Sequence, residues 1–272
     1  MHIETFSSEL FDFILRTYPG IFRHDLLRYL IGAGGTFLII NLLLSGYLAA
    51  RKIRPETPGW AQIRREILAS FRTVIIFSLS GLSIALLAWN GLADIRADAA
   101  EYGWWCFAAN VAVLIIAHDA WFYWSHRIMH RPRLFKWFHR LHHRSHNPTP
   151  FTSYAFDATE AVVNAAYLPL ILLVLPSSIP ALLFFTVHMM IRNALGHCGY
   201  EVFPARNNGR PLFDWMTTVT HHDLHHAYAG KNFGLYFTFW DRIMGTEHPR
   251  YHAEFAKAVA ALPARDPDPL PG

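Results

Sequence analysis

Residues 104–130 read WWCFAANVAVLIIAHDAWFYWSHRIMH, and this stretch decides the fold class. The part at 104–124 is long and apolar enough to cross a hydrocarbon core, which takes about 20 helical residues. It closes with an aromatic run at 121–124, typical of the belt at a membrane interface. His126 and His130 follow at a spacing that places both rings on one helical face. The stretch therefore predicts a membrane helix that presents two metal ligands at its end.

Other apolar stretches predict further membrane segments. Residues 30–50 and 73–93 are each long enough to span, and residues 4–18 predict a short amphipathic helix before them. Between 161 and 192, two shorter stretches flank Pro-Ser-Ser-Ile-Pro at 176–180. Each of the two is about 22 Å long as a helix, short of a core of about 30 Å. We expect a tight helical hairpin there, either re-entrant or built from two tilted spans.

The composition favours a membrane protein with a substantial polar part. Hydrophobic residues make up 53% of the 272-residue chain and charged residues 16%. The formal charge of +4 comes from Lys and Arg beside apolar segments, which indicates a membrane surface and no nucleic-acid partner. Cys106 and Cys198 are both expected to be reduced. The first residues lack a basic region and a cleavage site, so we expect no cleaved signal peptide.

The sequence shows no internal repeat and no low-complexity linker. We therefore expect a single membrane domain over residues 1–272. The tail at 262–272, which is rich in Pro and Asp, is expected to be disordered.

Basic residues in the loops indicate the orientation. They dominate the loops after the first and third spans, whereas the loop before the third span mixes both charges. The positive-inside rule places the two basic loops in the cytoplasm. Residues 125–150 and those from about 192 onward then share one cytoplasmic face. The basic residues are Arg51, Lys52, Arg54, Arg64, Arg65, Arg72, Arg127, Arg131, Arg133, Lys136, Arg140 and Arg144.

Eight of the 17 histidines fall into three tight groups. A pair spaced by four precedes two copies of an HxxHH motif, and one histidine stands between the copies. On a helix, HxxHH would aim its first two rings along one face and turn the third about 100° away, so one helix could reach two metals. Together these groups predict nine metal ligands. They are His126, His130, His139, His142, His143, His197, His222, His225 and His226.

The number of histidines restricts the kind of metal centre. Neutral imidazole suits Fe, Zn, Cu or Ni. Nine imidazoles shared by two ions exceed what a four-coordinate zinc needs, so the count favours six-coordinate ions with positions open for dioxygen. A merely basic face at the membrane surface would instead carry Lys and Arg.

Some further residues are candidates for roles beside the ligands. Five carboxylates are candidates to hold ligand N–H groups, and four more histidines have open roles near the motifs or inside apolar segments. The carboxylates are Asp119, Glu160, Glu201, Asp223 and Asp241. The histidines are His118, His146, His188 and His221.

At these residues the chain resembles the fatty acid hydroxylase/sterol desaturase superfamily. Residues 119–130 look like that family's DxxxYWxHRxxH, residues 139–151 like its HxxHH and PTPF run, and residues 222–246 like its HxxHH, NYG and WDRxxGT run. The resemblance covers roughly 115–248 with the motifs in order, which would be the catalytic region. The segment PTPFTSYAFD at 148–157 is nearest to the sterol C5-desaturase-like branch.

The resemblance implies an all-α integral membrane bundle of about four membrane helices under a cytoplasmic His-rich helical cap. It implies two Fe ions, with Zn as an ion that overexpression could load instead. Dioxygen would be the co-substrate, and electrons would come from a separate cytochrome or ferredoxin type protein. The reaction would hydroxylate or desaturate an unactivated C–H bond of a sterol or fatty acyl lipid. The membrane would be a bacterial inner membrane or of ER type, with the active site on its cytoplasmic side.

Two other classes of protein stay open at this stage. The chain could be a zinc-dependent membrane hydrolase or isomerase, or a membrane metal-binding or transport protein. The histidines lie at helix ends outside the spans, whereas a transporter places polar groups near mid-membrane. Consumption of dioxygen separates these classes, because neither alternative needs it.

Overall fold

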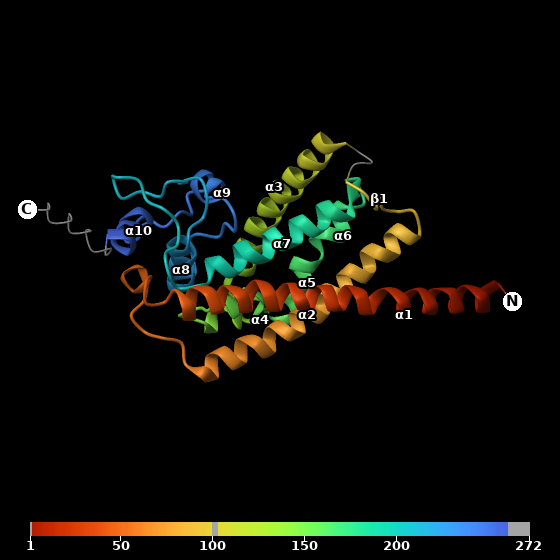
Figure 1. Ribbon diagram of the computed structural model, residues 1–272, viewed down its shortest axis with the longest axis horizontal. Coiled ribbons are helices and arrows are strands. Elements are labelled where there is room, and N and C mark those ends of the chain that lie inside the picture. Colours follow the sequence, from red (N-terminus) through yellow and green to blue (C-terminus); the bar gives the residue numbers. More distant parts are fainter. Residues whose placement is uncertain (1, 100–102, 261–272) are drawn as a thin grey trace, which may run out of the picture.

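The protein is mostly helical in the computed structural model, which describes residues 2–99 and 103–260 (Figure 1). The expected tail at 262–272 lies outside these residues. Within these described residues, four helices are long and apolar enough to cross a membrane, which confirms the predicted integral-membrane bundle. They are Ser7–Leu43, Trp60–Trp89 (α2), Trp104–Met129 (α3) and Ile179–Gly196 (α7).

One continuous helix takes the place of two elements expected at the N-terminus. α1 (His2–Tyr29) runs on into two stretches of π-helix, η1 (Leu30–Gly34) and η2 (Phe37–Leu43). The division into an amphipathic helix and a separate span is wrong, since Pro19 lies inside α1 without ending it. Packing against α2 supports the helix at this point, where the Tyr18 hydroxyl lies 3.1 Å from Ser78 Oγ.

The first span ends at Leu43 and not at residue 50. Ser45 Oγ donates to the carbonyl of Leu42 at 2.9 Å, a local bond that competes with a continuing helix. A short 3₁₀ turn, η3 (Ala49–Arg51), follows. Just before the end, Asn41 Nδ2 donates to the carbonyl of Cys198 at 3.0 Å. The end of the first span is therefore joined to the segment that follows α7.

The predicted hairpin at 161–192 has unequal arms. Its first arm consists of two short helices, α5 (Ala158–Ala165) and α6 (Tyr167–Ile171), and its second arm is α7. At the tip, strand β2 (Ser177–Ser178) pairs in parallel with β1 (Ile95–Arg96). Only α7 reaches the length of a candidate span within the described part of the hairpin.

The remaining helices form the cap. α8, α9 and α10 gather at the end of the bundle away from the N-terminus (Figure 1). The sequence forms short helices here because polar and turn residues interrupt every apolar run. The bounds are α4 (Pro132–Phe138), η5 (His142–Arg144), η6 (Pro150–Tyr154), α8 (Val219–Tyr228), α9 (Phe239–Ile243) and α10 (Tyr251–Ala260).

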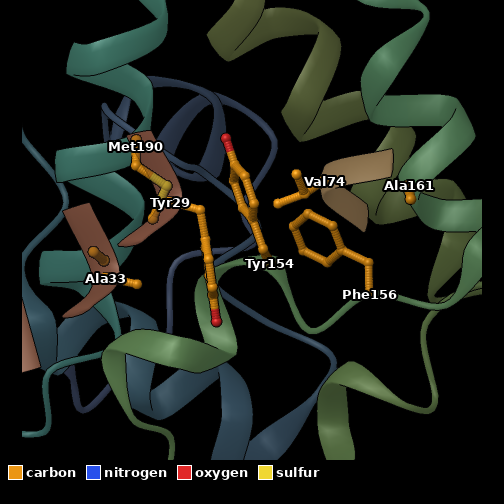
Figure 2. Close-up of a cluster of buried hydrophobic side chains, with 8 residues drawn as sticks. Tyr29, Ala33, Val74, Tyr154, Phe156, Ala161 and Met190 are labelled. Atoms are coloured by element: carbon orange, nitrogen blue, oxygen red, sulfur yellow. The ribbon is translucent and has the colours of Figure 1, made fainter. Parts of the chain in front are cut away.

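A buried aromatic cluster joins the cap to the membrane helices (Figure 2). Tyr29 of α1 stacks on Tyr154 of η6, with ring centroids 5.6 Å apart and planes 16° apart. Val74 of α2, Met190 of α7 and Phe156 complete the contact from three further segments. Since these segments are distant in sequence, burial of this cluster fixes the loop after the first HxxHH motif against the bundle.

A buried carboxylate at the cap end of α2 holds the same loop. Glu66 is 1% exposed and accepts hydrogen bonds from the hydroxyls of Ser145 at 2.7 Å and Thr149 at 2.5 Å. Gln62 donates to the same carboxylate at 2.7 Å. The charge is therefore satisfied inside the protein, as a buried carboxylate requires.

Asp119 on α3 holds the C-terminal part of the cap by accepting hydrogen bonds from its backbone. Its Oδ1 accepts the backbone N–H groups of Tyr236 at 2.8 Å and Phe237 at 3.2 Å. The residue is 2% exposed. Hydrogen bonds to a buried charged group contribute more than neutral ones, about 1.5–3 kcal/mol each.

Replacing Asp119 with Ala should lower the free energy of unfolding by about 2–3 kcal/mol, because two buried N–H groups lose their acceptor. The measurement is thermal unfolding in detergent. Asp119→Asn keeps an acceptor oxygen and should lose less. Asp12→Ala changes an exposed carboxylate on α1 and should leave the midpoint in place. An unchanged midpoint for Asp119→Ala would show that this contact does not hold the cap.

Candidate metal centre

Nine histidine side chains converge in two adjacent groups. Within each group the ligand nitrogens all lie within 4.8 Å of one another. The nine are those that the sequence singled out. The five-histidine group consists of His126, His130, His139, His143 and His225. The four-histidine group consists of His142, His197, His222 and His226.

The Nε2 atoms of the five-histidine group face one another at ligand spacing. His126 Nε2 lies 2.9 Å from His139 Nε2. His143 Nε2 lies 3.2 Å from His130 Nε2 and 3.0 Å from His225 Nε2. Two ligands at right angles on one ion, with metal–nitrogen bonds of about 2.1 Å, are about 3.0 Å apart. The donor set therefore fits a single metal ion.

The four-histidine group has the same spacing. His197 Nε2 lies 2.8 Å from His222 Nε2 and 3.4 Å from His142 Nε2, and His226 Nε2 lies 3.2 Å from His222 Nε2. The two groups touch, since the rings of His143 and His226 are 5.0 Å apart between centroids. The arrangement fits two ions side by side.

The second HxxHH motif lies on α8 and divides between the groups. His222 and His226 belong to the four-histidine group, and His225 belongs to the other. The prediction that the first two rings share a face is wrong. On an α-helix, residue i+4 lies about 40° around the axis from residue i, whereas i+3 lies about 60° away on the other side. The first and last rings are therefore the natural pair.

The first HxxHH motif divides in the same way without forming an α-helix. α4 ends just before His139, and the last two histidines lie in the 3₁₀ turn η5. His139 and His143 belong to the five-histidine group, and His142 belongs to the four-histidine group. Each HxxHH motif thus contributes to both groups.

The outer nitrogens of several rings are held by the backbone. A carbonyl oxygen only accepts, so an Nδ1 atom beside it carries the proton and the lone pair is left on Nε2, toward the other rings. Three such pairs are present: His126 Nδ1 to Phe233 O at 3.0 Å, His197 Nδ1 to Asn193 O at 2.8 Å, and His225 Nδ1 to Lys231 O at 2.7 Å.

The electrostatics keep the rings neutral. Burial lowers the pKa of His197 and of His225 to about 4. Burial, together with the neighbouring imidazoles, also holds the pKa values of His142 and His226 well below the ordinary value. These rings therefore have free lone pairs at neutral pH, which is the form that binds metal.

Among the described residues, Glu160 is the one of the five candidate carboxylates that contacts a histidine of either group. Its Oε1 lies 2.7 Å from His139 Nδ1, and each side chain is 1% exposed. Burial raises the pKa of the Glu160 carboxyl well above its usual range. A carboxyl group against the outer nitrogen of a ligand orients the ring and adjusts its basicity.

The other four carboxylates hold the scaffold instead. Glu201 accepts from the backbone and side chain of Thr220 at the start of α8, at 2.8 and 2.7 Å. Asp223 pairs with Arg54 at 2.7 Å. Asp119 holds the backbone as described above, and the role of Asp241 is described below.

The comparisons with known proteins identify the family. The model of the fatty acid hydroxylase family matches residues 111–246, which include all nine histidines and half of the chain. The chain belongs to the fatty acid hydroxylase family. This confirms the resemblance seen in the sequence motifs. No solved structure matches the chain significantly.

Curated relatives of this fatty acid hydroxylase family member include sterol enzymes. A Delta(7)-sterol 5(6)-desaturase from Gibberella zeae is 29% identical over 79% of this chain, and the chain covers 66% of that protein. The lathosterol oxidase of Mus musculus is 28% identical over 69% of the chain, and 62% of it is covered. Methylsterol monooxygenase 1 of Rattus norvegicus is 30% identical over 55% of the chain. The chain thus spans less than two thirds of the length of the first two relatives.

The four histidines with open roles lie outside both groups. His118 Nδ1 lies 2.9 Å from the Tyr236 hydroxyl, and His146 is exposed. His221 Nε2 lies 3.6 Å from Asp241 Oδ2. His188 packs its ring against Tyr236, with centroids 4.9 Å apart.

An apolar cavity of about 340 Å³ opens beside the histidine groups. Its walls come from α1, α2, α3, α5, α6 and α7. Two of its lining residues touch the centre: Phe156 lies 5.5 Å from the His142 ring and Phe122 5.0 Å from the His126 ring, between centroids. A ligand in this cavity would be separated from the histidines by a single layer of side chains.

The loop at 231–234 supports the centre, and sequence reasoning missed its role. Its carbonyls accept from two rings of the five-histidine group, His126 and His225. Asn232 has a φ of 58°, a left-handed conformation that Asn tolerates better than most residues. Asp241 accepts the N–H groups of Phe233 at 2.9 Å and Gly234 at 2.8 Å. The available signal was Asn-Phe-Gly at 232–234, which corresponds to the family's NYG.

Gly234→Ala should displace this loop, because the added Cβ would lie 2.5 Å from the Phe237 carbonyl oxygen and 3.0 Å from Asp241 Oδ2. The Phe233 carbonyl would then move away from His126. We expect a loss of roughly tenfold or more in metal affinity, measured by metal titration. Gly230→Ala is the matched control, since its Cβ meets the nearest atom at 3.6 Å. Equal metal affinity for both variants would contradict the supporting role.

Proposed function

We propose that the chain is a membrane di-iron oxidoreductase that uses dioxygen to hydroxylate or desaturate an unactivated C–H bond of a lipid. The observation that carries the proposal is the pair of adjacent all-histidine groups beside an apolar cavity. A six-coordinate ion bound by five or four imidazoles keeps at least one coordination position open. Tetrahedral zinc sites would not need this many histidines.

The two groups would hold one ion each, and bound iron would supply the oxidising power for attack on a C–H bond. The protein's own side chains bind and orient the lipid. Phe122 and Phe156 form an apolar layer between cavity and histidines, which keeps water away from the reacting carbon. The backbone carbonyls behind the rings keep the protons on Nδ1, so that each Nε2 stays free for the metal.

The names of the relatives support a sterol as substrate, and the description of the family as fatty acid hydroxylase supports a fatty acyl lipid. A separate electron-transfer protein, of the cytochrome or ferredoxin type, would supply reducing equivalents. The centre would face the cytoplasm, since basic residues concentrate at the cap end of the membrane helices, among them Arg64, Arg65 and Arg72 of α2.

The first test is metal content and dioxygen uptake of the purified, detergent-solubilised protein. About two irons per chain, with rapid uptake of oxygen by the reduced protein, is the expected result. Zinc or no metal in protein supplied with iron, together with no oxygen uptake, would favour a hydrolase or a transport protein instead.

His225→Ala and His142→Ala test one histidine from each group. Each variant should lose metal and oxygen uptake together, because removing one imidazole leaves its neighbours facing an incomplete site. His146→Ala is the control, since this exposed histidine lies outside both groups. Full metal content in either of the first two variants would refute the assignment of that ligand.

Filling the cavity should separate lipid binding from metal binding. Ala165→Phe places a ring among the lining residues, so we expect normal iron content and loss of lipid turnover. Val162→Phe, on the same helix but 56% exposed, should keep both. The measurements are elemental analysis and product formation from a lipid mixture. Normal turnover by Ala165→Phe would exclude this cavity as the substrate site.

A further inference from the structure

The apolar cavity contains one set of polar side chains that neither the metal centre nor the scaffold uses. His24, Asp25 and Arg28 enter its wall from α1, and Asn164 enters from α5. His24 and Arg28 are spaced by four, so they share one face of α1. Asp25 and Arg28 form an ion pair of 2.9 Å, with side chains only 9% and 7% exposed.

Several polar atoms of this set lack a hydrogen-bond partner. Among the described residues, His24 Nε2, Arg28 Nε and both amide atoms of Asn164 are buried and make no hydrogen bond. Unsatisfied buried polar atoms are rare in folded proteins, and each one calls for an explanation. Ser80, another polar residue of the same wall, is satisfied, since its hydroxyl donates to the Ala165 carbonyl at 2.7 Å. The unpartnered atoms of the described lining residues thus come from α1, from α5 and, with the Tyr154 hydroxyl, from η6.

The charges of the wall restrict the kind of ligand. Among the described residues that line the cavity, Asp25 is the one acidic residue and Arg28 is the one Lys or Arg residue, so their charges cancel. A carboxylate or phosphate would enter an apolar cavity without a net countercharge, which is costly. A hydroxyl or carbonyl oxygen carries no such cost and can accept from His24, Arg28 or Asn164, while a hydroxyl can also donate to Asn164.

We propose that His24, Arg28 and Asn164 bind the uncharged oxygen of a lipid alcohol or ketone, and so fix the position of its hydrocarbon part beside the histidine groups. The apolar remainder of the cavity takes the hydrocarbon, which reaches toward Phe122 and Phe156. These are positioning residues: they decide which lipid binds and which carbon lies near the centre. That the lipid carbon beside the histidine groups is the one that reacts rests on the proposed function. The binding of the lipid oxygen does not depend on it.

The test is equilibrium binding of three probes to the metal-loaded protein in detergent, without oxygen or reductant. The probes are cholestanol, its deoxy analogue cholestane and its sulfate ester. Cholestanol should bind about fivefold to tenfold more tightly than cholestane, and the sulfate ester should bind more weakly than cholestanol. Equal binding of cholestanol and cholestane, or tighter binding of the sulfate, overturns the proposal.

Asn164→Leu gives a second, independent readout. It should remove most of the difference in affinity between cholestanol and cholestane and leave cholestane binding unchanged. The midpoint of thermal unfolding should stay level or rise, because the variant removes two unpartnered polar atoms from an apolar wall. Leu168→Met, in the same wall, is the matched control and should keep the full difference. A retained difference in Asn164→Leu would exclude its amide as a contact.

The two proposals fail in different ways. Absence of iron or of oxygen uptake counts against the di-iron function and leaves the binding result intact. Loss of the preference for the alcohol, in a protein that still takes up oxygen, counts against the polar site alone.

Discussion

The fold has to hold nine neutral imidazoles together, with neighbouring Nε2 atoms such as those of His126 and His139 2.9 Å apart and those of His142 and His197 3.4 Å apart. Lone pairs at this spacing do not attract one another, so the rings must be held in place from behind. Backbone carbonyls of Phe233, Asn193 and Lys231 do this for three rings. The Glu160 carboxyl lies 2.7 Å from the outer nitrogen of a fourth ring, His139. Burial suppresses protonation, which would otherwise fill the same lone pairs.

Carboxylates and histidines have separate tasks in this protein. Glu66 and Asp119 project from membrane helices and accept hydrogen bonds from the cap, while Asp241 and Glu201 organise the backbone within it. Each of these acids is buried and satisfied by N–H or O–H donors. The cap is therefore attached to the bundle by charge-assisted hydrogen bonds, and the apolar contacts of Tyr29 with Tyr154 add to them (Figure 2).

The apolar cavity connects the membrane helices with the cap. Its walls belong to the spans, but Phe122 and Phe156 also touch the histidine rings. A long apolar molecule can thus lie between membrane helices while part of it stays near the centre. In the polar set, His24, Asp25 and Arg28 precede the region that carries the sequence motifs, and Asn164 lies between two of the motifs, which explains why no motif pointed to the set.

Hydropathy and the repeated His spacing are local properties of the chain, so they were enough to predict about four membrane helices and to single out the nine histidines. They did not determine how those histidines divide. That division depends on the 3₁₀ turn at His142 and on the approach of α8 to α3, between residues about 95 positions apart such as His130 and His225. The continuous helix through Pro19, the cavity and the unpartnered Asn164 likewise depend on packing between distant segments. Contacts of this kind form only when the chain folds, so local sequence patterns cannot predict them.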